Sequence, residues 1–266
     1  MTIFIYDGTF EGLLTLVNEV REMKTEPERI STFSSYQETL WDSRYDVFTD
    51  EEKCNNIWHR INDNLPDNQS QLIYRVFLSE MQGIEMLIFR FINKILDTPY
   101  SVTGDFGDNC VLETHQIFKK VSREAERIRM FARFQEIEGE MFFAPIEPKY
   151  NVLPLVLNHF KNRYPLQNWL IYDMKRKYGF YHTAKEILQI KLENSKMNSI
   201  NGKAGKKVLS ADEIQFQQLW LSYLDSVTIK ERRNLRLQMQ HMPKRFWKFL
   251  TEKNTEAICQ GDILQV

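Results

Sequence analysis

The sequence predicts an α+β fold, in which a small, mostly antiparallel sheet packs against a helical layer and a helical C-terminal region follows. Along the chain a strand pattern comes first, several helical patterns follow, strand patterns then cluster, and helical patterns return. The 266 residues are 42% hydrophobic and 13% aromatic, which is enough apolar material for a buried core. We find no internal repeat and no long low-complexity tract, and this composition excludes a disordered chain.

The first 46 residues predict one strand and one helix. Residues 2–6 are β-branched or aromatic and end at Asp7-Gly8, which is typical of a strand closed by a turn. Apolar residues then recur at near-helical spacing over residues 13–23, until a polar region that contains a proline. We expect residues 24–46 to form a loop or to carry only a short strand.

Three helices are predicted in the following part of the chain. Residues 50–65 have the pattern of a modest helix, and residues 69–96 that of a long one. A second long helix is expected over residues 109–136, with one buried apolar side. The apolar positions of the two long helices are Ile73, Phe77, Ile84, Ile88, Phe91 and Ile95 in the first, and Phe118, Val121, Ala125, Ile128 and Ala132 in the second.

The predicted sheet comes from the middle of the chain. Strand patterns occupy residues 139–144 and 167–173, and a helical pattern over residues 152–163 lies between them. A hairpin is expected next, because a basic turn is followed by Phe180, Tyr181 and His182, which return as a strand.

We predict three regions along the chain. Residues 1–195 form the α+β core, and residues 196–209 are polar, basic and glycine-containing, which is typical of a flexible linker. Residues 210–266 form a helical, basic C-terminal region packed on the core. Ser210, followed three residues later by Glu213, is typical of a capping box and marks the start of its first helix.

Residues 230–253 concentrate positive charge and aromatic rings in a chain whose net charge is −1. Eight cationic side chains there accompany two glutamates. The cations are Lys230, Arg232, Arg233, Arg236, Lys244, Arg245, Lys248 and Lys253. Cations neutralise phosphates and release counterions, and the rings of Phe246, Trp247 and Phe249 offer faces on which bases stack. The segment therefore predicts a nucleic-acid interface; the alternative is a basic amphipathic helix with its rings packed inward and its cations solvated.

Two further groups of cations are candidates for the same interface. One lies on the second long helix, where neighbouring glutamates are able to neutralise much of the charge. The other is the turn of the predicted hairpin. We predict nucleic-acid contacts from twelve residues in all: Arg123, Arg127, Lys175, Arg176, Lys177, Arg232, Arg233, Arg236, Lys244, Arg245, Trp247 and Lys248.

Several common chemistries have no sequence support. The chain has no glycine-rich phosphate loop, no dinucleotide-binding motif, no zinc-deaminase motif and no Gly-x-Ser-x-Gly. Its three cysteines are widely scattered, so we predict neither a disulfide framework nor a metal or iron–sulfur site, and no cofactor. The N-terminus lacks a signal-peptide pattern, and no apolar run reaches the roughly 18 residues of a membrane span. We expect a cytoplasmic protein.

Four side chains are candidates for acid–base catalysis, although whether the protein is an enzyme stays open. Asp7 lies in a turn, where Asp is also a common turn former, and His159 lies in a helix. Asp173 and His182 flank the hairpin, and a carboxylate that orients an imidazole is a familiar acid–base device. A turn at residues 177–178 would pair these two, whereas a turn at residues 178–179 would place Lys175 opposite His182.

Three stretches together resemble a known family: YDGTFEGLL at 6–14, FFAPIEPKYNVLPLVLNHFKNRYPLQNWLIYDMKR at 142–176, and FQQLWLSYLDSVTIKERRNLRLQMQHMPKRFWKFL at 216–250. The family is a bacterial domain of unknown function that is described in terms of DNA metabolism or DNA repair. Its members are typically encoded beside a radical-SAM protein, and some are fused to a uracil-DNA-glycosylase-like domain. The resemblance implies a DNA context and no particular catalytic residues.

Together, the charge pattern and the resemblance predict a DNA-binding component of a bacterial DNA repair or modification system. Its expected partners are DNA and a separately encoded radical-SAM protein. We expect no association with a membrane. Two alternatives stay open. One is an enzyme that acts on damaged DNA by acid–base chemistry, and the other is a protein-interaction module for the radical-SAM partner.

Overall fold

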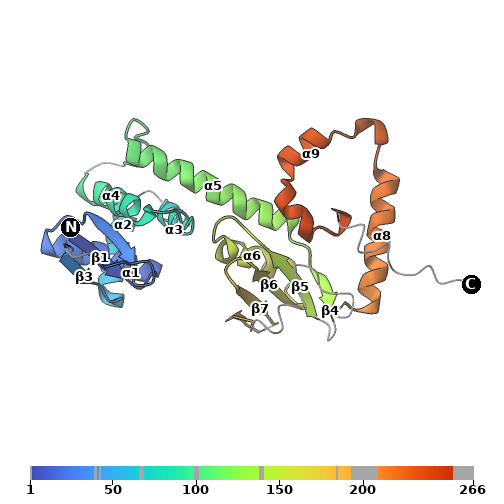
Figure 1. The fold of residues 1–266 in the computed structure, drawn as a ribbon, viewed down its shortest axis with the longest axis horizontal. Helices are drawn as coiled ribbons and strands as arrows, with labels where there is room; N and C mark the ends of the chain where they lie inside the picture. Colours follow the sequence, from blue (N-terminus) through green and yellow to red (C-terminus); the bar gives the residue numbers. More distant parts are fainter. Residues whose placement is uncertain are drawn as a thin grey trace, which may run out of the picture. The chain divides into compact units, whose positions relative to one another are not determined.

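The computed structural model describes residues 2–38, 41, 43–65, 69–98, 102–137, 141–183, 185–192 and 209–253 (Figure 1). The chain forms two compact units, residues 1–123 and 124–266. The boundary between them falls inside one long helix, α5 (Asn109–Phe131), and the sequence did not indicate it. The predicted division at residue 195 stays a prediction, because residues 193–208 lie outside the described part of the chain.

The first unit contains a three-stranded parallel sheet in the order β2-β1-β3. Its strands are β1 (Thr2–Tyr6), β2 (Arg29–Thr32) and β3 (Ser43–Asp46). Residues 3–6 of the central strand are buried, and β1 is paired on both edges. Residues 24–46 therefore contain two strands, which corrects the expectation of a loop or one short strand. Each has only four residues, and β3 is exposed throughout, so neither carries a clear hydrophobic alternation.

The helices of the first unit confirm two predictions and correct a third. Helices α1 (Phe10–Met23) and α2 (Glu51–Asn64) form where their patterns predict them. The long helix expected over residues 69–96 is two helices, α3 (Gln71–Phe77) and α4 (Ile84–Asp97). Glu80 and Gly83 between them have φ of 49° and 78°, a left-handed backbone that cannot continue an α-helix. The apolar stripe persisted across the break, because both helices bury an apolar side.

Helix α5 buries the predicted side, including Val121, Ala125 and Ile128. It ends at Phe131, five residues earlier than expected, because residues 135–137 leave the helix to form a strand. That strand, β4 (Gln135–Ile137), pairs with residues 141–143 of the next one. Tertiary pairing overrides helical propensity at this point.

The second unit contains a five-stranded mixed sheet in the order β4-β5-β6-β7-β8. Its other strands are β5 (Met141–Ile146), β6 (Asn168–Asp173), β7 (Tyr178–His182) and β8 (Ile187–Ile190). Strands β5 and β6 are parallel and the remaining neighbours are antiparallel. The fold is thus mixed α and β with one parallel and one mixed sheet, and the expected single, mostly antiparallel sheet is not matched. The physical reason is α6 (Leu153–Arg163), a crossover helix that returns the chain so that β6 runs parallel to β5.

The β6–β7 hairpin requires a glycine at position 179. Gly179 lies opposite Tyr172, and a Cβ atom at this position would come within 2.6 Å of both the carbonyl oxygen of Ile171 and the ring of Tyr172. The strands bury large rings here: Trp169 and Tyr172 are both fully enclosed. Close approach of the two backbones therefore accompanies dense aromatic packing.

The C-terminal region of the second unit begins as predicted. Ser210 caps α8 (Ala211–Val227), its hydroxyl accepting a hydrogen bond from the Glu213 N–H at 3.1 Å. The Glu213 carboxylate accepts from the N–H of Glu136 on β4 rather than completing the capping box. After α8 come a 3₁₀ turn η1 (Lys230–Arg232), helix α9 (Leu235–His241), and the 3₁₀ helices η2 (Lys244–Phe249) and η3 (Thr251–Lys253). Among the described residues, no helix has both the length and the apolar character of a bilayer span.

Candidate nucleic-acid interface

The aromatic rings of the basic C-terminal segment point inward. Phe246 and Phe249 are buried, and the Phe246 ring packs against Phe131 with centroids 5.2 Å apart. Trp247 is half-buried; its Nε1–H donates to the Met242 carbonyl at 3.0 Å, and the Lys253 ammonium lies 4.7 Å from its ring centroid. The two phenylalanines are therefore unavailable to a nucleobase. The segment matches the alternative in its inward rings, but it is a series of short turns rather than one amphipathic helix.

Arg245 anchors this segment to α5. Its Nη1 donates to Glu124 Oε1 at 2.7 Å, and its Nη2 pairs with Glu124 Oε2. The Glu124 side chain is only 3% exposed, and its Oε1 also accepts from the Lys149 N–H at 2.8 Å. A buried carboxylate needs such a partner, because an unpaired charge in this position is strongly unfavourable.

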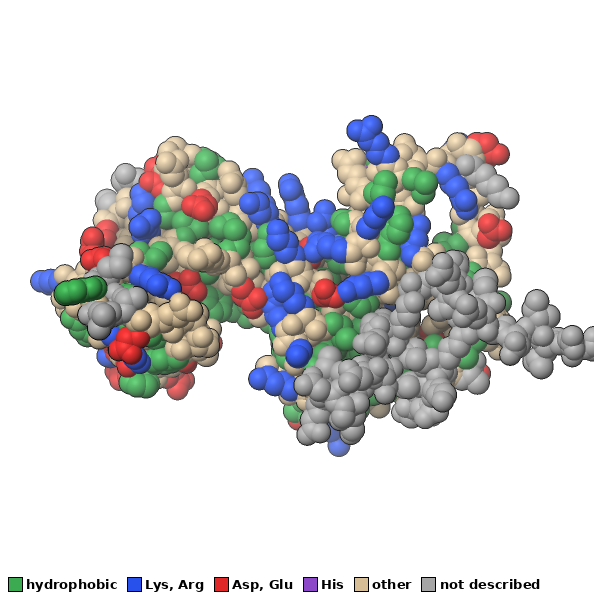
Figure 2. Space-filling model, viewed as in Figure 1, with side chains coloured by type: hydrophobic (Ala, Val, Ile, Leu, Met, Phe, Trp, Pro, Cys, Tyr) green, Lys and Arg blue, Asp and Glu red, His purple; other side chains and the backbone are tan. Residues whose placement is uncertain are grey.

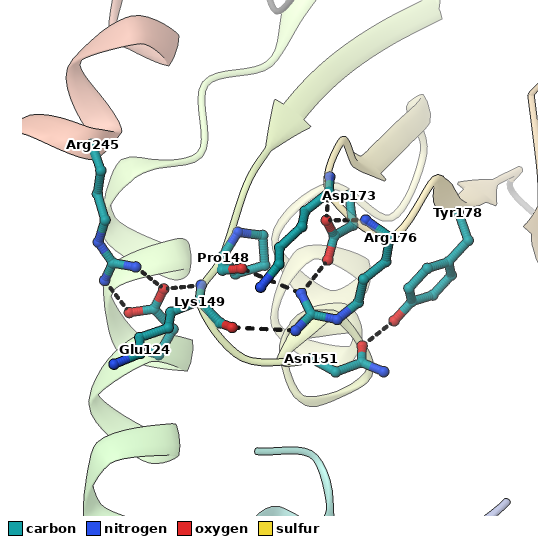
Figure 3. A network of polar contacts seen from close by, with 9 residues as sticks. Glu124, Pro148, Lys149, Asn151, Asp173, Arg176, Tyr178 and Arg245 are labelled. Atoms are coloured by element: carbon teal, nitrogen blue, oxygen red, sulfur yellow. Dashed lines mark hydrogen bonds and ion pairs between the residues drawn. The ribbon is translucent and has the colours of Figure 1, made fainter. Parts of the chain in front are cut away.

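Asp173 and Arg176 form a second buried pair, in the hairpin turn. Asp173 is fully buried and accepts from the N–H groups of Lys175 and Arg176, at 2.9 and 3.0 Å, and from Arg176 Nη1 at 2.9 Å. The guanidinium also donates to the carbonyls of Pro148 and Lys149. Asp173 and Arg176 thus hold the turn to the loop after β5, as Figure 3 shows. Lys175 and Lys177 are left exposed.

The loop after β5 joins these two pairs. Lys149 donates its N–H to Glu124 and accepts through its carbonyl from Arg176, so that one residue connects the α5 pair to the hairpin pair (Figure 3). Its side chain is exposed. Since β5 and β6 are parallel, their carboxyl ends lie at the same edge of the sheet, and the loop therefore meets the hairpin turn.

A basic hollow opens beside this junction. It has a volume of about 380 Å³ and is lined by Glu147, Pro148, Lys149, Lys175, Lys244, Arg245 and Lys248. Five cationic side chains thus share the hollow with one carboxylate, and Glu147 is paired with Lys248. Among the described residues, Lys149, Lys175 and Lys244 make no ion pair. Figure 2 shows many Lys and Arg side chains and few acidic ones where the η2 segment meets the rest of the second unit.

A family comparison covers this part of the chain. The model of DUF4130, a domain of unknown function, matches residues 82–252. The chain belongs to the DUF4130 family. A search of curated proteins gave no match. The DUF4130 match includes every residue of the basic hollow and excludes Asp7.

Within the DUF4130 region, the structure brings together four of the twelve predicted nucleic-acid residues: Lys175, Lys244, Arg245 and Lys248. Arg176 and Trp247 lie close in sequence but are engaged in the contacts described above. Lys177, Arg232, Arg233 and Arg236 are exposed and do not line the hollow, and neither do Arg123 and Arg127 on α5. Sequence reasoning missed Lys149, which follows a proline at the carboxyl end of β5; the signal that could have found it was the parallel pairing of β5 with β6.

The hairpin does not bring Asp173 and His182 together. The register pairs Asp173 with Tyr178 and His182 with Trp169, so neither predicted turn is correct: the chain turns over residues 174–177, with Lys177 at φ 57°. His182 is buried, stacked on Trp169 at 4.7 Å, with Nδ1 3.0 Å from the Gln167 carbonyl oxygen. His159 is exposed on α6, with its ring against Phe160.

Asp7 lies in the first unit, in the turn after β1. Its carboxylate accepts from the Thr9 N–H at 2.9 Å and from the hydroxyls of Thr9 and Thr49, both at 2.7 Å. Burial opposes ionisation of Asp7, but these hydrogen bonds outweigh it and lower the pKa. The arrangement ties the β1 turn to the loop after β3. Within the described part of the chain, no three His, Cys, Asp or Glu side chains group as metal ligands.

Proposed function

We propose that this protein binds nucleic acid, with DNA as the expected polymer, through the basic hollow. The observation that carries the proposal is the convergence of three lysines from separate segments: Lys149 after β5, Lys175 in the hairpin turn, and Lys244 at the start of η2. No ion pair with a described residue neutralises them. Phosphates are the polyanions that such a cluster attracts, and each neutralised phosphate releases counterions.

The arginines and Lys248 support the same conclusion in a different way. Arg245 and Lys248 pair with Glu124 and Glu147, the carboxylates next to the hollow, and so remove local negative charge. The buried pairs also fix the backbone that carries Lys149 and Lys175, which preorganises the cluster. In this proposal the protein is a DNA-binding component of a bacterial repair or modification system, the setting that the family resemblance implies.

The test removes the three lysines that make no ion pair with a described residue, and it includes a matched control. In Lys149→Gln/Lys175→Gln/Lys244→Gln, affinity for a labelled oligonucleotide should fall, and the slope of log K against log salt should lose about 2 to 3 units. The control, Lys161→Gln/Lys185→Gln/Lys191→Gln, removes the same charge from exposed positions of the second unit outside the hollow. Fluorescence anisotropy over a salt series measures both. Equal losses in the two variants would contradict a localised site, and salt-independent binding would contradict the proposal altogether.

A second candidate function, protein interaction, is favoured by an apolar stripe on α8. Phe216, Leu219, Tyr223 and Val227 recur every three or four positions, and each is more than half exposed. This is the spacing by which one helix docks in the groove of a partner. The expected occupant is the separately encoded radical-SAM protein. If the two proteins co-purify after nuclease treatment, the interaction does not depend on nucleic acid. Leu219→Asp/Tyr223→Asp should abolish the co-purification. The control Gln218→Asp/Ser222→Asp, at exposed positions of the same helix, should retain it.

A further inference from the structure

A second hollow in the second unit is lined by rings instead of cations. This aromatic hollow, of about 200 Å³, is formed by Phe134, Phe142, Tyr164, Gln167 and Trp169. The Phe134 ring lies edge-to-face with Tyr164 at 5.4 Å and with Trp169 at 6.0 Å. Trp169 is fixed further, because its Nε1–H donates to the Tyr164 carbonyl at 3.2 Å and its other contacts include the stacked His182 ring. The walls are thus held in place by one another.

A larger hollow shares Phe134 and Tyr164 with the aromatic one and adds polar groups beside it. It has a volume of about 860 Å³ and contains His159 and Arg163, one turn apart on α6. Arg163 Nε lies 3.2 Å from the Tyr164 hydroxyl and its guanidinium lies over the Tyr164 ring. Among the described residues Arg163 pairs with no carboxylate. Other arginines of this hollow do pair: Arg129 with Glu126 and Arg133 with Glu252.

We propose that the aromatic hollow binds one unstacked nucleobase of a single strand, with Arg163 on the adjoining phosphate. Its volume is below the roughly 300 Å³ at which pockets for larger ligands begin, so it suits a single ring system. The half-buried rings of Phe134, Phe142 and Tyr164 supply aromatic surface for a base. The exposed Gln167 amide can both donate to and accept from the edge of that base. Proteins that handle single strands combine such rings with cations that follow the backbone.

This inference rests on the proposed function in taking DNA as the polymer, but it concerns different residues. It also relocates the base contact. The sequence indicated the rings of the C-terminal segment for that role, and two of those are buried. In the aromatic hollow Trp169 is also buried, but Phe134, Phe142 and Tyr164 are only half-buried and line the cavity.

The experiment compares an intact single strand with an abasic strand of equal length and phosphate charge. Wild type should bind the intact strand about 5- to 150-fold more tightly, because each stacked base adds affinity that an abasic strand cannot supply. Gln167→Trp, which fills the hollow without removing a wall ring, should abolish this difference. Gln189→Trp adds the same ring at an exposed position of β8 and should behave as wild type. Arg163→Gln should weaken binding of both strands slightly.

The two proposals fail in distinguishable ways. Equal affinities of wild type for the two strands, or a difference that Gln167→Trp retains, would overturn the base-binding inference while leaving the basic hollow intact. If the triple-lysine variant binds both strands more weakly but keeps the ratio of the two affinities, the loss is due to the basic hollow alone. If wild type binds neither strand, the proposed function fails, and titration with deoxynucleoside monophosphates followed by tryptophan fluorescence then tests the aromatic hollow. Binding there that Gln167→Trp removes would support the inference, and absence of any binding would overturn it.

Discussion

Arg245 and Glu124, which lie 121 positions apart in the sequence, form a two-point ion pair that closes the C-terminal segment onto α5. The carboxylate is almost fully buried, whereas the guanidinium is partly exposed and forms one side of the basic hollow. One arginine thus has a structural partner on its inner side and a surface role on its outer side. We expect replacement of Arg245 to reduce the stability of the second unit more than it reduces nucleic-acid binding.

Arg245→Ala is expected to lower the free energy of unfolding of the second unit by about 3 kcal/mol, because it leaves Glu124 buried with a single backbone donor. Urea unfolding followed by tryptophan fluorescence measures this. Arg236→Ala, at an exposed position of α9, should change stability by less than about 0.5 kcal/mol. An Arg245→Ala variant as stable as that control would show that water reaches Glu124.

Local chemistry was enough to predict several elements. Strand β1 ends at its Asp-Gly turn, and α8 starts at Ser210, because a single residue or dipeptide fixes each boundary. The partners of a strand are not local information. The parallel pairing of β5 with β6 follows from the crossover helix between them, and without it the position of Lys149 beside the hairpin turn could not be deduced.

The candidate site shows the same limit. Charge density in residues 230–253 located part of the basic hollow, since Lys244, Arg245 and Lys248 line it. The pattern could not tell which rings point inward, because the burial of Phe246 depends on Phe131, more than a hundred positions away. Nor could the pattern reveal that Arg176 forms an ion pair with the buried Asp173 carboxylate, because this pair depends on the register of the hairpin.

Asp173→Asn is expected to destabilise the second unit by about 3 kcal/mol, because it removes the charge that compensates the largely buried Arg176 guanidinium. The substitution keeps the shape of the side chain, so the loss reports the ion pair rather than a cavity. Thermal or urea unfolding gives the value, with Asp225→Asn on the exposed side of α8 as the matched control. If Asp173 instead acts in catalysis and not in the turn, the variant should retain wild-type stability.

Gly179→Ala is expected to destabilise the β6–β7 hairpin by about 2 kcal/mol or more, since the added methyl meets backbone atoms of the neighbouring strand that cannot rotate away. Gly104→Ala, where the added atom has nothing within 4 Å, is the control and should be close to neutral. Hydrogen exchange of the β6 and β7 amides would localise the effect. Equal protection in both variants would contradict the close approach.

The carboxylate of Asp7 is expected to make the stability of the first unit pH-dependent below neutrality. Burial disfavours its charge, yet hydrogen bonds from Thr9 and Thr49 lower its pKa below the ordinary value of 3.8. A folded-state pKa below the unfolded one means that the carboxylate stabilises the fold above pH 3.8, and that this contribution is lost as the pH falls through the folded value. Thr49→Val removes one of these donors and should raise the Asp7 pKa toward 3.8, as measured by NMR titration of the carboxyl carbon. Thr25→Val, whose hydroxyl bonds to Met23 instead, should leave the titration unchanged; identical curves for Thr49→Val and wild type would mean that the Thr49 hydroxyl does not contribute to holding Asp7 ionised.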